Sequence, residues 1–387
     1  MIRYTTAGES HGPMLVGILE GIPAGLTLDL NALNGDLARR QAGYGRGARQ
    51  KIERDTARIV SGVRGGVTLG NPITILIENR DWKNWQALMD PMGPLKPGRE
   101  VYRPRPGHVD LAGRYKYGFD DLRNALERAS ARETAMRTAL GGVARQYLAA
   151  FGVDILSHVT MLGGIEARVA PAPNARLRTL VEASEVRCAD ELAAQRMISR
   201  ITAARAAGDT LGGLFEVVAE GLTPGLGAYT QWDQRLDARL ARALVSIPAI
   251  KGVEIGLGFA QAALAGTEVH DPILPGRGRG PRYRRPTNNA GGLEGGVTNG
   301  EPLVLRAAMK PISTTMKGIP SVDIRTRKAE KSTIERSDVC ALPAAGVVGE
   351  AVVALTLAEA YAEKFGGDAL KETLANHRNY VKETRRR

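Results

Sequence analysis

The sequence predicts an α+β fold in which helices pack against antiparallel sheets and the chain is duplicated within itself. Gly-rich turns recur by chance, so repeats of this kind carry weight only when several keep the same order. Three segments do so: GIPAGL (21–26) with GLTPGL (221–226), GGVTLGNP (65–72) with GGVTNGEP (295–302), and 139–154 with 353–368. We therefore expect a single domain over 1–387, built from two intertwined halves of approximately 1–210 and 211–387.

The expected strands are short β-branched runs bounded by glycine or proline. They lie at 13–20, 56–62, 73–78, 214–219 and 303–308. These runs come in clusters between long helices, without the regular strand–helix alternation of a doubly wound parallel sheet. The clustering favours antiparallel sheets.

Four helices are expected, at 120–151, 182–206, 233–245 and 346–365. The first carries its apolar side chains on one face, with Gly152 as a C-cap. Asp233 is expected to cap the third helix. The fourth is apolar on nearly every side, which predicts a helix buried in the core.

The composition is that of a soluble globular protein, with 387 residues, 43% hydrophobic and 24% charged. We see no apolar run of about 18 residues and no signal-peptide layout, so we expect no membrane segment and a cytoplasmic location. The two cysteines, Cys188 and Cys340, are too few for a disulfide framework or a zinc site, and we expect no metal.

The net charge of +12 indicates an anionic ligand. Aromatic residues make up only 5% of the chain, too few for many base-stacking platforms, so we expect no nucleic-acid partner. The arginines lie in Gly-containing segments at 39–49, 103–108 and 276–285. Guanidinium groups match phosphates and carboxylates, which favours small polyanionic ligands. A solvated basic surface would explain any one segment equally well.

Residues 8–12, GESHG, fit the G-x-S-x-G nucleophile elbow of serine hydrolases. An elbow follows a strand and precedes a helix, whereas here only seven residues precede it and a strand-like run follows. We favour a Gly-bounded turn that brings the backbone close to a ligand. Its His11 can exchange protons near neutral pH. A nucleophilic Ser10, which a phosphonate probe would label, is the alternative.

Three further stretches could contact an anion. His108 follows two prolines and lies near Arg105, although a neutral core histidine is the alternative. Arg128 and Arg132 are four residues apart on one helix face and could grip one anionic group. Residues 288–318 offer glycine N–H groups, then an ammonium and three hydroxyls in KPISTT.

Together these stretches resemble the chorismate synthase family over nearly the whole chain. The matching motifs occur in order: AGESHG, RRQAGYGRG, RPGHVDL, RASARETAMR, SIPAIKGVEIG, NNAGG, KPISTT and RSDVCALPAAGVV. The resemblance implies anti-1,4 elimination of phosphate from 5-enolpyruvylshikimate-3-phosphate to give chorismate, the last common step of the shikimate pathway to aromatic amino acids. It also implies a reduced FMN cofactor without net redox change, helices sandwiched between two antiparallel sheets with pseudo-twofold symmetry, and a homotetramer.

The resemblance assigns the site residues by position. It implies as catalytic residues Ser10, His11, His108 and Asp338. It implies as substrate-binding residues Arg40, Arg46, Arg49, Arg105, Arg132 and Arg336. It implies as FMN-binding residues Arg128, Ala129, Ser130, Pro248, Ala249, Gly295, Lys310, Pro311, Ile312, Ser313, Thr314 and Arg336. Arg40 and Arg46 are also the implied NADPH contacts in family members that can use it.

The resemblance also implies roles. His11 would be the acid for the departing phosphate, and His108 would protonate reduced flavin or stabilise its protonation state. Ser10 and Asp338 would relay the ring proton, although Asp338 alone could be a helix cap. We see no inserted segment beyond the family core, so we expect reduced flavin to come from elsewhere, with NADPH only a possible flavin reductant. A polyanion-binding protein without catalysis, such as an RNA-binding protein, is the alternative from another class.

Overall fold

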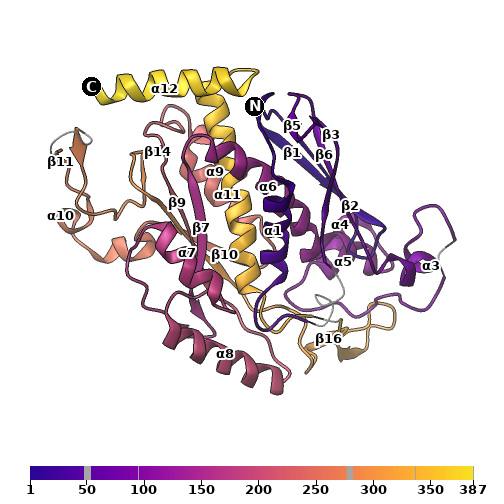
Figure 1. The fold of residues 1–387 in the computed structure, drawn as a ribbon. Helices are drawn as coiled ribbons and strands as arrows, with labels where there is room; N and C mark the ends of the chain where they lie inside the picture. Colours follow the sequence, from indigo (N-terminus) through magenta and orange to yellow (C-terminus); the bar gives the residue numbers. More distant parts are fainter. Residues whose placement is uncertain (48–53, 95, 277–281, 336, 387) are drawn as a thin grey trace.

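The computed structural model describes residues 1–47, 54–94, 96–276, 282–335 and 337–386 (Figure 1). Two antiparallel sheets organise it. The four-stranded sheet has the order β1-β2-β6-β3, with β1 (Arg3–Ala7), β2 (Met14–Glu20), β3 (Ala57–Ser61) and β6 (Ile73–Glu78). The five-stranded sheet has the order β10-β15-β9-β7-β8, with β7 (Asp154–Leu162), β8 (Ile165–Glu166), β9 (Gly213–Glu220), β10 (Ile250–Ile255) and β15 (Leu303–Met309).

Helices α6 (Thr134–Ala149) and α11 (Leu342–Phe365) join the two sheets (Figure 1). Helix α6 packs on β2 and β6, α11 packs on β7 and β9, and the two helices pack on each other. Helix α1 (Leu30–Gln41) lies against both, and α9 (Leu236–Val245) lies against α11. The helices contact closely at Gly141, where a Cβ would lie 2.4 Å from the Ala351 Cβ.

The remaining elements are short or peripheral. They are α3 (Gln86–Met89), α4 (Asp110–Tyr117), α5 (Arg123–Ala129), α7 (Asn174–Ala183), α8 (Glu191–Ala206), α10 (Gly266–Val269), α12 (Leu370–Arg386), β4 (Val63–Arg64), β5 (Val67–Thr68), β11 (Leu274–Pro275), β12 (Tyr283–Arg284), β13 (Leu293–Glu294), β14 (Val297–Thr298), β16 (Pro320–Val322) and β17 (Ala329–Lys331). Short 3₁₀ helices lie at Trp82–Asn84, Ala131–Glu133, Trp232–Gln234 and Gly258–Ala263.

Helix α11 is buried along nearly its whole length, as the sequence predicts. By length and composition alone, one helix in the described part of the chain could cross a membrane, namely α11. In its most apolar 18-residue window, 89% of the residues are buried inside the fold. Its apolarity is therefore accounted for by the core that it shares with α6 and the five-stranded sheet.

Two of the sequence repeats make equivalent contacts. Thr68 in β5 accepts a hydrogen bond from Leu26 N at 2.9 Å, and Thr298 in β14 accepts one from Leu226 N at 2.8 Å. Each threonine hydroxyl also donates to the carbonyl three residues before that leucine, at 2.6 Å and 2.7 Å. The strand order β1-β2-β6-β3 is matched by β7-β9-β15-β10 in the other sheet.

All five expected strands are present, but three helix predictions were wrong in detail. The expected helix 120–151 breaks at Ser130, whose ψ is 141°. Its side-chain oxygen accepts from Arg132 N, a local bond that competes with helix continuation. Helix α6 has Ala150 as its C-cap, and Gly152 follows with a φ of +82°.

The expected helices 182–206 and 233–245 also begin elsewhere. The former is replaced by α7 and by α8, and Asp190 caps α8 by accepting from Ala193 N at 3.0 Å. Asp233 lies in a 3₁₀ turn, and the extended Arg235 precedes α9 instead. A side-chain cap at Asp190 thus marks the start of α8, whereas α7 and α9 begin without one.

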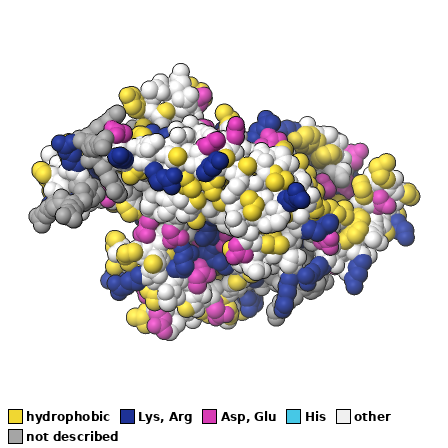
Figure 2. All heavy atoms as spheres, turned by 45° about the horizontal axis from the view of Figure 1, so that its top comes forward, with side chains coloured by type: hydrophobic (Ala, Val, Ile, Leu, Met, Phe, Trp, Pro, Cys, Tyr) yellow, Lys and Arg dark blue, Asp and Glu magenta, His cyan; other side chains and the backbone are white. Residues whose placement is uncertain are grey.

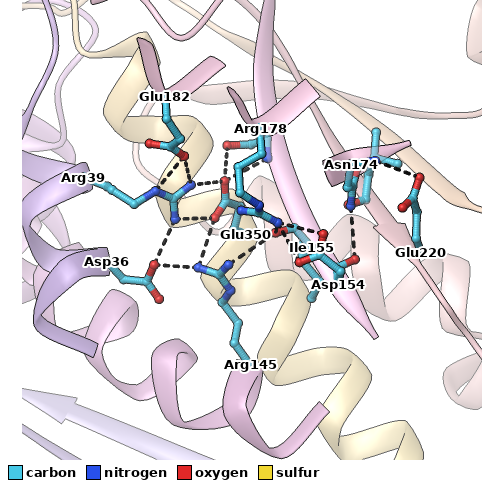
Figure 3. Close-up of polar contacts among 12 residues, drawn as sticks. Asp36, Arg39, Arg145, Asp154, Ile155, Asn174, Arg178, Glu182, Glu220 and Glu350 are labelled. Carbon is cyan, nitrogen blue, oxygen red and sulfur yellow. Dashed lines mark hydrogen bonds and ion pairs between the residues drawn. The ribbon is translucent and has the colours of Figure 1, made fainter. Parts of the chain in front are cut away.

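A buried cluster of charges ties the helices to the five-stranded sheet (Figure 3). Glu350 of α11 is fully buried and accepts from Arg39 Nη1 and Nη2 at 2.8 Å each. It also accepts from Ser157 N and Oγ at 2.8 Å, and Arg187 and Arg145 lie at 3.1 Å and 3.3 Å. Burial alone would raise the pKa of Glu350, but these arginines outweigh it and lower the pKa to about 2.

Candidate active site

The GESHG turn connects β1 to β2, so a strand rather than a helix follows it. Gly8 has a φ of +105°, and a Cβ there would lie 2.4 Å from Met14 O, so the turn requires glycine. Ser10 is buried, and its backbone N–H donates to Glu127 O at 3.0 Å. A nucleophile elbow needs a strand–turn–helix arrangement, so the hydrolase alternative fails on geometry.

His11 lies against a buried carboxylate. Its Nδ1 is 2.8 Å and 3.0 Å from the two carboxylate oxygens of Glu127, and its backbone N–H donates to Oε2 at 2.8 Å. Arg123 donates to Glu127 Oε1 at 3.1 Å. Burial alone would raise the pKa of Glu127, but the contacts with His11 and Arg123 outweigh it and lower the pKa.

The face of the His11 ring is covered by Trp85, which lies between the 3₁₀ turn at Trp82–Asn84 and α3. The two rings stack with centroids 3.7 Å apart and planes inclined by 25°. Trp85 Nε1 donates to Asp81 at 2.9 Å, and the Arg99 guanidinium lies 4.6 Å from the Trp85 ring centroid. Asn79 Nδ2 donates to Gly12 O at 2.8 Å and so connects the segment before Trp85 to the GESHG turn.

His108 has a similar arrangement at the start of α4. Its Nδ1 lies 2.6 Å from Asp110 Oδ1, and Asp110 is fully buried. Arg105 donates to both Asp110 oxygens, at 2.8 Å and 3.0 Å, and to Thr314 Oγ1 at 3.1 Å. Burial alone would raise the pKa of Asp110, but the hydrogen bonds from His108 and Arg105 hold that pKa well below its usual range.

The segment Lys310–Thr314 follows β15 and lies against the His108 loop. Lys310 Nζ donates to Gly107 O, and Lys310 N donates to Ala249 O at 3.0 Å. Burial, with help from the nearby Lys251, lowers the pKa of Lys310. Ala249 has a φ of +72°, a conformation that L residues other than glycine seldom adopt. The structure thus brings together the implied residues of 248–249, 310–314 and 105–108.

A third group of implied residues surrounds the C-terminal end of α1. Arg40 is buried, donates to Thr134 Oγ1 at 3.1 Å and 3.0 Å, and lies 3.6 Å from Asp55. Arg132 donates to Asp55 Oδ1 at 2.7 Å. Burial and the neighbouring cations lower the pKa of Arg40 to about 10, against the opposing effect of Asp55. This group therefore places two arginines in a buried environment.

Asp338 lies in the same group. It accepts from Arg46 Nη1 at 2.8 Å and from Gly47 N at 2.6 Å, so it holds the segment after α1 instead of capping a helix. Arg46 Nε is buried and has no hydrogen-bond partner among the described residues. A buried donor of this kind is costly unless a ligand accepts from it.

Some implied residues are placed differently or lie outside the described residues. Arg128 donates to the carbonyls of Thr6 and Gly8 at 2.8 Å and 3.0 Å, beside Ala129 and Ser130. Gly295 lies in the turn between β13 and β14, and Figure 1 shows β14 on the opposite side of the molecule from α4, α5 and β16. Arg49 and Arg336 lie outside the described residues.

Sequence reasoning missed the carboxylates that hold the two histidines. Asp110 lies only two residues after His108, and a carboxylate at this spacing from a histidine was the available signal. Glu127 is 116 residues from His11, so no local signal pairs them. Trp85 and Asp55 carried no signal either. In the described ranges, no group of three or more His, Cys, Asp or Glu residues could hold a metal ion.

Comparisons with known proteins show the family to which this chain belongs. The family model described as chorismate synthase matches residues 2–362. Curated proteins named chorismate synthase from Desulforudis audaxviator and Geobacter sulfurreducens are each 54% identical, over 386 and 391 residues. These alignments cover 100% of this chain and 98% and 100% of those proteins. A solved structure titled as the crystal structure of chorismate synthase has a TM-score of 0.80 and 41% identity, covering 100% of this chain and 99% of that one. The chain therefore belongs to the chorismate synthase family, whose members are lyases that form chorismate.

Proposed function

We propose that this chain eliminates phosphate from 5-enolpyruvylshikimate-3-phosphate with reduced FMN held beside His108. The observation that carries the proposal is the pair of histidines, each with Nδ1 on a buried, ionised carboxylate, in a fold that also buries Arg40, Arg105 and Arg132. Phosphate leaves an allylic carbon readily only when its charge is neutralised, and these groups supply cations and an acid.

The residues around His108 fit a flavin phosphate and the polar edge of a flavin ring. The Lys310 ammonium and the hydroxyls of Ser313 and Thr314 provide hydrogen-bond donors. Gly107 lets the Lys310 ammonium approach closely, because a Cβ at this position would lie only 3.3 Å from Lys310 Nζ. The strained Ala249 marks a backbone that the surrounding structure holds in place, as is common where a ligand binds. When bound, reduced FMN would lend electron density to the substrate and recover it.

The substrate anions are proposed to meet Arg40, Arg46 and Arg132. Arg46 Nε supports this assignment because it is a buried donor without a partner among the described residues. Arg105 already donates to Asp110 and Thr314, so it would bind substrate through its other N–H groups. Arg49 and Arg336 remain in the proposal on the family resemblance alone.

The proton roles follow from the same contacts. His11 would donate a proton to the departing phosphate, and His108 would set the protonation state of the flavin. Ser10, in the same turn as His11, and Asp338, beside Arg46, would relay the ring proton. Arg40 and Arg46 would meet NADPH only if the enzyme could use it, and we propose that it takes reduced flavin from elsewhere.

We also propose that the fold is a sandwich of helices between two sheets, built as a pseudo-twofold duplication within one domain. The matched strand orders and the paired Thr68 and Thr298 contacts support this. In that correspondence β7 takes the place of β1, so the second copy begins before residue 210.

We further propose a cytoplasmic homotetramer. The aromatic side chains of Tyr229, Trp232 and Phe259 are exposed, at 78%, 77% and 81%. Subunit contacts would cover such side chains.

Four further FMN contacts are proposed on the family resemblance alone. They are those of Arg128, Ala129, Ser130 and Gly295.

The test is an anaerobic assay with the enolpyruvyl substrate, run with dithionite-reduced FMN and separately with NADPH. Reduced FMN should support chorismate formation, NADPH alone should not, and His11→Ala and His108→Ala should each abolish most turnover. Near-wild-type turnover in both variants would refute the catalytic assignment.

A non-catalytic polyanion-binding protein predicts instead tight RNA binding with a steep salt dependence. On the face shown in Figure 2, Lys and Arg side chains are interspersed with acidic and hydrophobic ones rather than forming one basic surface. Binding that is weak and insensitive to salt would exclude this alternative.

A further inference from the structure

We propose that Glu127 is a positioning residue for the elimination: it fixes the His11 ring with Nδ1 directed into the protein, so that His11 gives its proton from Nε2. This inference rests on the proposed role of His11 as the acid for the leaving phosphate. In that step the C–O bond breaks, phosphate takes the electron pair, and the proton moves from Nε2 to a phosphate oxygen. His11 is left neutral, with its remaining proton on Nδ1.

Three contacts from one carboxylate hold His11. The backbone N–H and Nδ1 lie at 2.8 Å from Glu127 Oε2 and Oε1, and Nδ1 also lies 3.0 Å from Oε2. An ionised carboxylate only accepts hydrogen bonds, so Nδ1 carries a proton in both charge states of the ring. Nε2 is therefore the nitrogen that can lose its proton.

Glu127 is itself held in place. Its side chain is 1% exposed, and Arg123 donates to Oε1 at 3.1 Å while also reaching Glu335 at 3.2 Å. Burial raises the pKa of Glu127, but the contacts with His11 and Arg123 outweigh it and lower the pKa, so the carboxylate stays ionised and accepts from Nδ1. A fixed acceptor at Nδ1 leaves the Nε2 proton as the one that the leaving group can take.

Trp85 makes the state of His11 measurable. Its indole stacks on the His11 ring at 3.7 Å, and a protonated imidazole in such contact quenches indole fluorescence. The chain contains three tryptophans, so replacing Trp82 and Trp232 by phenylalanine leaves Trp85 as the only source of indole emission. Charged groups near this pair include Arg99 and Arg123 over the Trp85 ring, Asp81 at Trp85 Nε1, and Glu9 in the turn that carries His11. Glu335 pairs with Arg123.

The experiment compares Glu127→Gln with its parent in the Trp82→Phe, Trp232→Phe background of the full-length chain. Emission from the parent should rise as the pH rises and His11 loses its proton. In Glu127→Gln the midpoint should move to lower pH, because an adjacent negative charge has been removed. With reduced FMN, kcat should fall by about 10- to 100-fold, while KM changes by less than about threefold.

Glu133→Gln is the matched control. Glu133 is also buried and close in sequence, but its carboxylate accepts from Thr6 Oγ1 and Arg137 Nε rather than from His11. Its midpoint and kcat should match the parent. If circular dichroism shows that Glu127→Gln does not fold, Glu127→Asp takes its place. This variant keeps the negative charge but moves it one methylene away from His11. Its kcat should be lower than that of the parent, and its midpoint should shift by less than that of Glu127→Gln.

An unchanged midpoint together with an unchanged kcat in Glu127→Gln or Glu127→Asp would overturn the inference. A lowered kcat with an unchanged midpoint would also overturn it, because a general structural defect could cause that pattern. If His11→Ala stays active, the proposed role of His11 as the acid is wrong, and Glu127 cannot position an acid. This failure can be told apart from a failure of the Glu127–His11 contact, because the midpoint of Glu127→Gln would still shift.

Discussion

Glu350 is expected to contribute several kcal/mol to stability through the buried charge cluster of Figure 3. Replacing it by glutamine leaves Arg39, Arg145 and Arg187 facing a neutral amide. Breaking a buried ion pair in this way costs about 3–5 kcal/mol. The shift of its pKa from 4.5 to about 2 corresponds to about 3 kcal/mol, which agrees in scale.

Differential scanning calorimetry measures this effect. For 387 residues the unfolding entropy is about 0.8 kcal/mol/K, so Glu350→Gln should lower Tm by about 4–6 °C. The pKa of Glu350 is depressed in the folded state, so its contribution is complete above about pH 5 and is lost as the pH falls toward 2. The difference between wild type and variant should therefore shrink over that acid range.

Glu182→Gln is the control for Glu350→Gln. Glu182 contacts Arg39 and Arg187 as well, but its side chain is 34% exposed. Exposed ion pairs contribute at most about 1 kcal/mol, so its Tm should fall by about 1 °C. A Glu350→Gln variant no less stable than Glu182→Gln would refute the reasoning from burial.

Two further predictions concern packing and the repeats. Gly141→Ala should cost about 1–3 kcal/mol because its Cβ would meet the Ala351 Cβ, whereas Gly35→Ala in α1 meets nothing within 4 Å and should gain about 0.5–1 kcal/mol. Urea unfolding of both variants checks this, and equal effects would contradict it. Thr68→Val and Thr298→Val should each cost about 1–3 kcal/mol, since each leaves a buried leucine N–H without its acceptor. Thermal unfolding measures the loss of stability in each variant. If the losses in Thr68→Val and Thr298→Val differ by more than about 1 kcal/mol, the two repeats are not equivalent.

Local pattern predicted those strands that have one apolar face. The run 214–219 became β9, whose residues alternate between buried and half-buried. By contrast, β7 was not predicted, because its residues are mostly buried on both faces and show no alternation. Helix α11 covers one part of β7 and α7 contacts it too, an environment that only the assembled fold creates.

For the site, the sequence by itself determined the residue types and the family to which they belong. GESHG, RPGH and KPISTT could be recognised because each motif is contiguous. The tertiary structure decided which carboxylate holds which histidine, and that Trp85 covers His11. Glu127 reaches His11 across 116 residues because α5 and the turn after β1 pack together. Hydrogen bonds form between groups that packing brings within about 3 Å, and no local pattern records such a distance.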